Sequence, residues 1–202
     1  MKYLYLLVSI LTIGISASNY ESIHISENKK NLSKEIYSIL KRDHFEARFD
    51  KTDFNERYIQ AIIDKLDKNK NYFTLDEVNH FIEKSRFQND DDFNIELGYE
   101  LINLYFKKLI LFTEYQIELT KDNSFDFNKE EYLDIYYEDN QWALSVDHLK
   151  EQWRLETKND LLIAQTSDSS SSEPNNDLIK RYENRIRRIN QQKEEDIFSL
   201  AI

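Results

Sequence analysis

The spacing best suited to chemistry is that of a metal site, and it lies in the run Asp67-Lys68-Asn69-Lys70-Asn71. The first, third and fifth residues of this run match oxygen ligands of a calcium-binding EF-hand loop, which connects two helices. The later positions do not match, because Tyr72 stands where the loop needs glycine and Val78 stands where it needs glutamate. We interpret the run as an ordinary turn between helices, with calcium binding as the alternative.

Residue types that catalyse hydrolysis or bind other metals are present but scattered. No two histidines have the three- or four-residue spacing that brings two rings to one metal ion; they are His24, His44, His80 and His148. No serine stands in a Gly-x-Ser-x-Gly elbow, and the serine-rich segment 167–176 lacks the rigidity that holds a nucleophile in attack geometry. The sequence therefore predicts no catalytic, cofactor-binding or metal-binding residues.

Two other groups have a simple structural interpretation. The runs Asp90-Asp91-Asp92 and Glu130-Glu131 contain carboxylates suited to acid and base catalysis, but in so charged a chain they are more typical of solvated faces or helix starts. Trp142 and Trp153 have rings that stack on ligands, but small helical domains use tryptophan mainly in the core. Neither group predicts a site.

The end of the chain differs in charge from the rest. Residues 177–202 hold six Lys and Arg against five acids, or +1, whereas residues 19–176 hold 20 against 33, or -13. Nucleic-acid binding is one interpretation of this basic segment, but an exported and strongly acidic protein favours pairing with carboxylates of the same fold or of a neighbouring domain. We expect a domain or partner interface that includes Arg181, Arg185, Arg188 and Phe198.

The composition indicates that helices position all of these residues. The chain has 202 residues and 40% hydrophobic content, enough for one substantial core. Two glycines and one proline cannot supply the tight turns of a sandwich or barrel. The absence of cysteine excludes disulfides and a cysteine nucleophile, and the formal charge of -11 repels nucleic acid and anionic lipid.

Apolar periodicity and capping signals predict an all-α fold, an irregular multi-helix bundle around one long central helix. The central helix is expected over residues 92–121, where apolar residues cover more than half the circumference. Before it we expect a helix over 33–47 and helix starts at Asp53 and Thr74, each followed three residues later by glutamate. After it we expect a loop with a short helix over 122–144, and a helix over 146–164 with Leu149, Trp153, Leu155 and Leu162 inward. Residues 167–176 are expected to form a flexible loop, followed by one last long helix marked by Leu178, Tyr182, Ile186 and Ile189.

The first 18 residues have the pattern of a cleaved signal peptide. Lys2 provides a positive start, residues 4–15 are apolar, and Ala17, Ser18 and Asn19 form the expected cleavage region. The apolar run is short for a membrane span, so a retained anchor is the less favoured alternative. We expect an exported, periplasmic protein whose mature domain is 19–202, with no stable membrane span after cleavage.

Two blocks of residues indicate a family. One block is Ile179 through Ile189 followed by Glu195-Asp196-Ile197-Phe198-Ser199-Leu200-Ala201; the other is His44-Phe45, Phe54, Tyr58, Leu66-Asp67, Asn71-Tyr72-Phe73 and Asp76. In order and spacing they resemble the N-terminal helical domain of periplasmic tail-specific, or carboxy-terminal processing, serine proteases. The likeness covers most of residues 19–202 and is weaker between residues 122 and 176.

The resemblance implies a domain that does not itself cut peptide bonds. In the family this domain precedes a PDZ module that captures apolar C-termini, a protease core with a serine nucleophile and a lysine base, and a further helical domain. None of those parts is in this sequence, so we expect a truncated, non-catalytic scaffold without cofactors. Its expected partners are proteins, either its own downstream PDZ and protease domains or an adaptor lipoprotein, and not nucleic acid. The alternative is a stand-alone secreted helical protein-interaction module.

Overall fold

The computed structural model describes residues 20–43, 54–87, 93–134, 141–166 and 173–202. The predicted signal peptide 1–18, with Ala17, Ser18 and Asn19, lies outside these ranges, as do His44 and Asp53. Within them the chain is helical, without a strand ladder, which confirms the predicted all-α class. None of the described helices is both long enough and apolar enough to cross a membrane.

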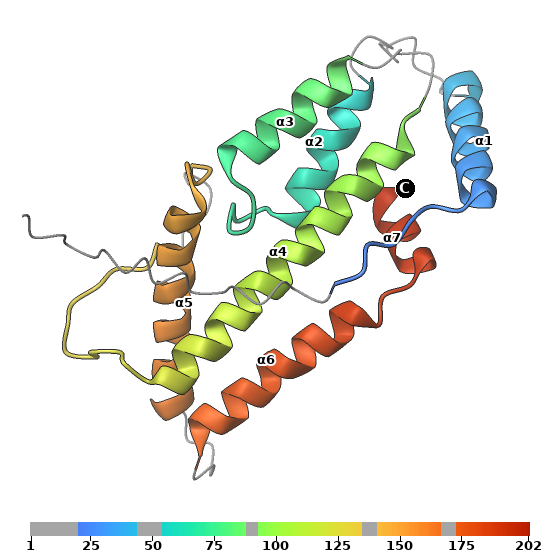
Figure 1. Cartoon of the computed structure of the whole chain (residues 1–202). Coiled ribbons are helices and arrows are strands. Elements are labelled where there is room, and N and C mark those ends of the chain that lie inside the picture. The colour runs from blue at the N-terminus through green and yellow to red at the C-terminus, as the bar shows by residue number, and fades with distance from the viewer. Residues whose placement is uncertain (1–19, 44–53, 88–92, 135–140, 167–172) are drawn as a thin grey trace, which may run out of the picture.

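Seven helices make up the described fold. They are α1 (Glu27–Asp43), α2 (Phe54–Leu66), α3 (Leu75–Arg86), α4 (Ile95–Asp122), α5 (Val146–Thr166), α6 (Pro174–Asn190) and α7 (Glu194–Ala201). Helix α4 runs through the centre, with α2 and α3 beside its first half and α5 beside its second half (Figure 1). Helix α6 lies along α4, and α7 then packs against α4 as well. The bundle is therefore organised around α4, as the sequence predicts.

Helix α4 is central because its apolar residues surround most of its circumference. Its first turn is capped by Asn94, whose side chain accepts the Leu97 N–H at 3.0 Å. It ends where Asn123 takes a left-handed conformation with φ of 48°. Side chains that the other helices cover completely or nearly so include Ile95, Leu97, Leu101, Ile102, Ile110 and Phe112. A 28-residue helix of this kind is stabilised mainly by burial on several sides.

The core is divided along α4. The main cluster joins α2, α3, α7 and the first half of α4, and its fully buried members include Ile59, Ile63, Phe73 and Ile197. Further along, Phe112, Leu149 and Trp153 form a second cluster between α4 and α5. Leu161, Leu178 and Tyr182 form a third, which joins α5 to α6. Helix α5 is thus held by the two smaller clusters, whereas α6 contributes Leu178 and Tyr182 to the third cluster and Ile189 to the main one.

Several predicted boundaries were wrong. Residues 123–134 and 141–144 contain no helix, and the rest of the expected loop with a short helix over 122–144 lies outside the described residues. Helix α6 begins at Pro174, inside the expected flexible loop, because a proline fits the first turn of a helix. The expected single last helix is two, since the chain turns between Asn190 and Glu194. Leu162, expected to face inward, is 46% exposed, whereas Leu149 and Trp153 are fully buried as expected.

Candidate functional site

The predicted calcium-like run forms a turn that its own carboxylate closes. Asp67 accepts backbone N–H groups from Asn71 at 2.7 Å and from Tyr72 and Phe73 at 2.9 Å. Lys70 takes a left-handed conformation with φ of 58°, which lets the chain reverse around the carboxylate. Burial raises the pKa of Asp67, which is 2% exposed, and the three N–H groups oppose that rise. The Asp67 oxygens, which a calcium loop would direct at the metal, are engaged by backbone amides.

The same turn leads into a set of buried polar contacts. The Trp153 indole N–H of α5 donates to the Asn71 carbonyl at 2.7 Å. The Asn71 side-chain amide then donates to Glu156 Oε1 at 2.7 Å, also on α5. A turn between α2 and α3 is therefore fixed to α5 by two hydrogen bonds across more than eighty residues of sequence. Polar groups taken from water in this way need such partners to offset their desolvation.

Glu156 has the most perturbed carboxyl group of these contacts. Burial, together with the nearby Asp160 carboxylate, raises its pKa to about 7, while Arg185 and Asn71 oppose the rise. The folded state therefore favours the protonated form of this carboxyl group more strongly than water does. A carboxyl group with such a pKa is a frequent sign of an active site, but buried structural networks produce the same perturbation.

Helix α6 joins these contacts through Tyr182 and Arg185. The Tyr182 hydroxyl donates to Asp160 Oδ2 at 2.7 Å and accepts from Gln116 Nε2 at 3.2 Å. The Arg185 guanidinium donates to Gln116 Oε1 at 2.9 Å. These residues link α4, α5 and α6 around one polar core. We call this set the interior network: Asn71, Gln116, Trp153, Glu156, Asp160, Tyr182 and Arg185.

The four predicted interface residues occupy two environments. Arg181 and Arg188 are exposed, and Arg185, on the same flank of α6, is half-buried and bonded into the interior network. Phe198 is 9% exposed within the main core cluster, with the Lys29 ammonium 4.6 Å from its ring centre. The prediction of a partner interface remains untested, and its exposed members are Arg181 and Arg188.

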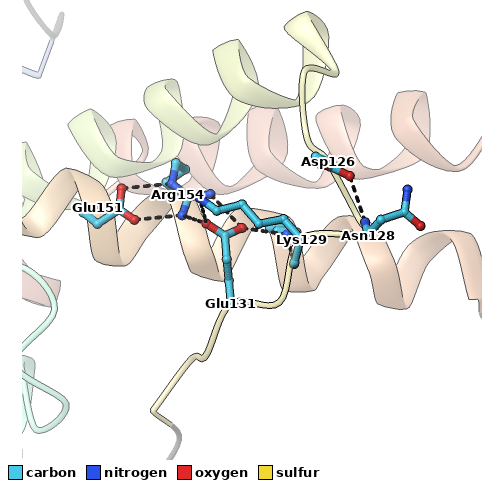
Figure 2. Close-up of polar contacts among 7 residues, drawn as sticks. Asp126, Asn128, Lys129, Glu131, Glu151 and Arg154 are labelled. Atoms are coloured by element: carbon cyan, nitrogen blue, oxygen red, sulfur yellow. Dashed lines mark hydrogen bonds and ion pairs between the residues drawn. The ribbon is translucent and has the colours of Figure 1, made fainter.

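A second polar cluster, which the sequence analysis did not predict, fixes the segment after α4. Glu131 accepts from Arg154 Nη2 at 2.6 Å and from Lys158 Nζ at 2.6 Å, and Lys129 lies 3.1 Å away. Figure 2 shows Arg154 lying between Glu131 and Glu151, which it also contacts at 2.7 Å. These donors lower the pKa of Glu131 to about 2. Glu131 of the Glu130-Glu131 run, which the sequence did not assign to catalysis, is held as a structural anion.

Three of the described serine hydroxyls are bonded back into their own helices. Ser33, Ser85 and Ser199 donate to carbonyl oxygens three or four residues earlier, at 2.7 to 2.9 Å. A serine in this arrangement has no base to take its proton. Among the described residues, no group of three or more His, Asp and Glu is arranged to hold a metal ion. What the arrangement of buried polar groups can do is fix helices relative to one another.

Comparisons with known proteins agree with the resemblance found in the sequence. Residues 36–202 match the family model described as the tail specific protease N-terminal domain. The chain is also similar to the tail-specific protease of Haemophilus influenzae (strain ATCC 51907 / DSM 11121 / KW20 / Rd), with 25% identity over 181 residues. That alignment covers 88% of this chain and 26% of the relative. The chain thus spans about a quarter of the length of the curated relative that it matches.

Proposed function

Because the chain belongs to the tail-specific protease N-terminal domain family, we propose that it is a non-catalytic scaffold that positions other protein domains beside a protease centre. The observation that carries this proposal is the use of its buried polar groups. The carboxyl, hydroxyl and guanidinium groups of the interior network form contacts between α4, α5, α6 and the turn at Asp67. Groups committed in this way hold a shape instead of reacting with a peptide.

The exposed flank of α6 is the surface through which the scaffold engages its partner. Leu178, Tyr182 and Ile189 anchor the inner face of the helix. Arg181 and Arg188 lie about two turns apart on the outer flank of α6, and both are cations in a chain whose net charge is negative. Such a flank attracts carboxylates on a protein partner, either the PDZ and protease domains of a tail-specific protease or an adaptor lipoprotein. The formal charge of -11 disfavours nucleic acid as the partner.

The proposed location is the periplasm, after export by the N-terminal segment. This proposal is supported by the signal-like pattern of residues 1–18 and by membership in the tail-specific protease family, whose proteases are periplasmic. Expression of the full chain in bacteria, followed by N-terminal sequencing of the periplasmic fraction, tests it. We expect a mature protein that starts at Ser18 or Asn19, and recovery of an uncleaved chain in the cytoplasm would contradict the proposal.

Two measurements test the scaffold. The purified chain, incubated with an unfolded protein substrate, is expected to release no peptides, and turnover that scales with chain concentration would refute the non-catalytic assignment. For the partner, the probe is the remainder of the Haemophilus influenzae relative beyond the matched region, produced as a separate polypeptide. We expect the chain to bind it, and the R181E/R188E double variant to bind at least about tenfold more weakly.

A matched control separates the proposed flank from a general charge effect. Lys34 and Lys41 lie on α1, away from α6, so the K34E/K41E double variant makes the same change in net charge. We expect it to bind the probe as the unchanged chain does, at equal ionic strength. Equal weakening of both double variants, or no binding by the unchanged chain, would contradict a docking surface on α6.

A further inference from the structure

A groove follows α4 between the segment that precedes α1 and the end of α3. Its volume is about 540 Å³, within the range of roughly 300 to 1,000 Å³ typical of ligand sites. The half-buried Leu104 contributes apolar surface, and the groove extends along α4 from Asn94 to Lys107. Thirteen steps of 1.5 Å along a helix give about 20 Å, the length of about six extended residues. The groove therefore has the dimensions of a short extended peptide.

One wall of the groove is already a peptide held by its backbone. We call residues 20–26 the strap; it runs from the start of α1 toward the middle of α4 (Figure 1). The buried Asn103 side chain accepts the Ile23 N–H at 2.9 Å and donates to the Ile23 carbonyl at 2.9 Å. The Tyr20 hydroxyl donates to the same Asn103 oxygen at 2.8 Å. The two hydrogen bonds between Asn103 and Ile23 match those that a neighbouring strand would make with the Ile23 backbone.

The other edge of the strap has unused hydrogen-bonding groups. Ser22 and His24 line the groove, and their backbone N–H and C=O groups make no hydrogen bond within the ranges that the structure describes. In an extended chain, the backbone N–H and C=O groups of successive residues point to opposite edges. Ser22 and His24 therefore present the edge of the strap that does not hydrogen-bond with Asn103. An edge of this kind is a template on which a further extended segment pairs.

Charges along the groove favour a carboxylate at one end. Lys30 pairs with Glu96 at 2.5 Å, and Lys84 pairs with Glu100 at 2.5 Å. Lys107 continues this side of α4, is exposed, and has no ion pair with the described residues. An incoming segment thus meets two neutralised charge pairs and then one uncompensated cation.

We propose that this groove binds an extended peptide segment, which pairs with the Ser22 and His24 edge of the strap and places a carboxylate at Lys107. Alternate side chains of the segment point into the groove, where apolar ones cover Leu104. The ligand class is therefore an extended stretch of another protein that alternates apolar and acidic side chains. This site lies on the face of α4 next to α1 and α3 and is separate from the α6 flank.

The test uses the full chain and a fluorescein-labelled hexapeptide that alternates valine and glutamate. We expect saturable fluorescence anisotropy, and at least about fivefold weaker binding to the Lys107→Glu variant than to the unchanged chain. Lys121→Glu, on the same helix but outside the groove, is the control and should bind as the unchanged chain does. Circular dichroism verifies that both variants keep their helical content.

A second probe tests the backbone pairing itself. The same hexapeptide is made in two forms, each with N-methyl groups on one alternate set of amides. We expect one form to lose at least tenfold in affinity and the other to bind nearly normally, because only one edge of a paired strand donates to its neighbour. No saturation, equal effects of the two methylated forms, or equal weakening by the two lysine variants would each overturn the proposal.

Discussion

Replacing Glu156 by glutamine is expected to stabilise the protein, and increasingly so as pH rises. The physical reason is that burial, together with Asp160, raises the pKa of Glu156 to about 7, so the folded state favours the protonated carboxyl. Glutamine is neutral at every pH and has a similar shape. Its side-chain oxygen can still accept the hydrogen bond that Asn71 donates at 2.7 Å. The substitution thus removes a buried charge and keeps the contact.

The magnitude follows from the two pKa values. The ordinary value is 4.5 and the folded value is about 7, so the two differ by about 2.5 pH units, and each unit corresponds to about 1.4 kcal/mol. Because the folded pKa is the higher one, the contribution of Glu156 to the free energy of unfolding is fully present below pH 4.5, where the group is protonated. It is lost as the pH rises through 7. The gain from Glu156→Gln is therefore expected to grow from about 1 kcal/mol near pH 5.5 to about 3 kcal/mol near pH 8.5.

The assay is urea-induced unfolding of the unchanged chain and the Glu156→Gln variant, followed by circular dichroism at several pH values between about 5.5 and 8.5. The difference in unfolding free energy is plotted against pH, with equal urea dependence required of both proteins. A difference that stays constant across this range, or a variant that is less stable at the alkaline end, would refute the buried, proton-binding state assigned to Glu156.

Three further substitutions test other parts of the packing. Glu131→Gln should destabilise the protein at neutral pH, and the difference should close as pH falls from 4.5 toward 2, because ion pairs lower the pKa of Glu131 to about 2; acid titration of unfolding checks this. Tyr58→Phe should raise stability by about 1 kcal/mol, since the buried Tyr58 hydroxyl has no hydrogen-bond partner among the described residues, and unchanged or lower stability in urea would count against this view. Tyr182→Phe should cost about 1 to 3 kcal/mol, because it leaves Asp160 and Gln116 without their shared hydroxyl; a neutral effect in thermal melts would be inconsistent with the interior network.

The elements predicted best from sequence are those specified by local chemistry. Thr74 and Glu77 form the predicted capping box, with each side chain bonded to the backbone of the other residue. Helix α4 was predicted within about three residues at each end, because its apolar residues recur over many turns. Leu162 was misplaced because an apolar residue on a helix has no marked direction until its neighbours are known. Apolar exposure of this kind is common on protein surfaces.

The polar contacts were much harder to predict, because they join residues distant in sequence. Glu131 and Arg154 are 23 positions apart, and Asn71 and Glu156 are 85 apart. Neither spacing is a recognised motif, and a carboxylate on a helix gives no sign in the sequence that it will be buried. The Asp67 turn, by contrast, was predicted in place, and its three amide contacts are local, since the carboxylate accepts from residues four to six positions later.

Arg185 connects the interior network, which fixes the helices, with the exposed flank of α6, which is the proposed docking surface. It lies one turn from Arg181 and from Arg188 on the proposed docking flank, yet its guanidinium donates to Gln116 inside the bundle and lowers the pKa of Glu156. A carboxylate that docks on this flank competes with the interior for the same cation. If docking draws Arg185 outward, Glu156 loses a positive neighbour, its pKa rises, and the complex takes up a proton. Linkage then requires docking to be stronger at lower pH, so the buried network and the exposed flank are one thermodynamic system.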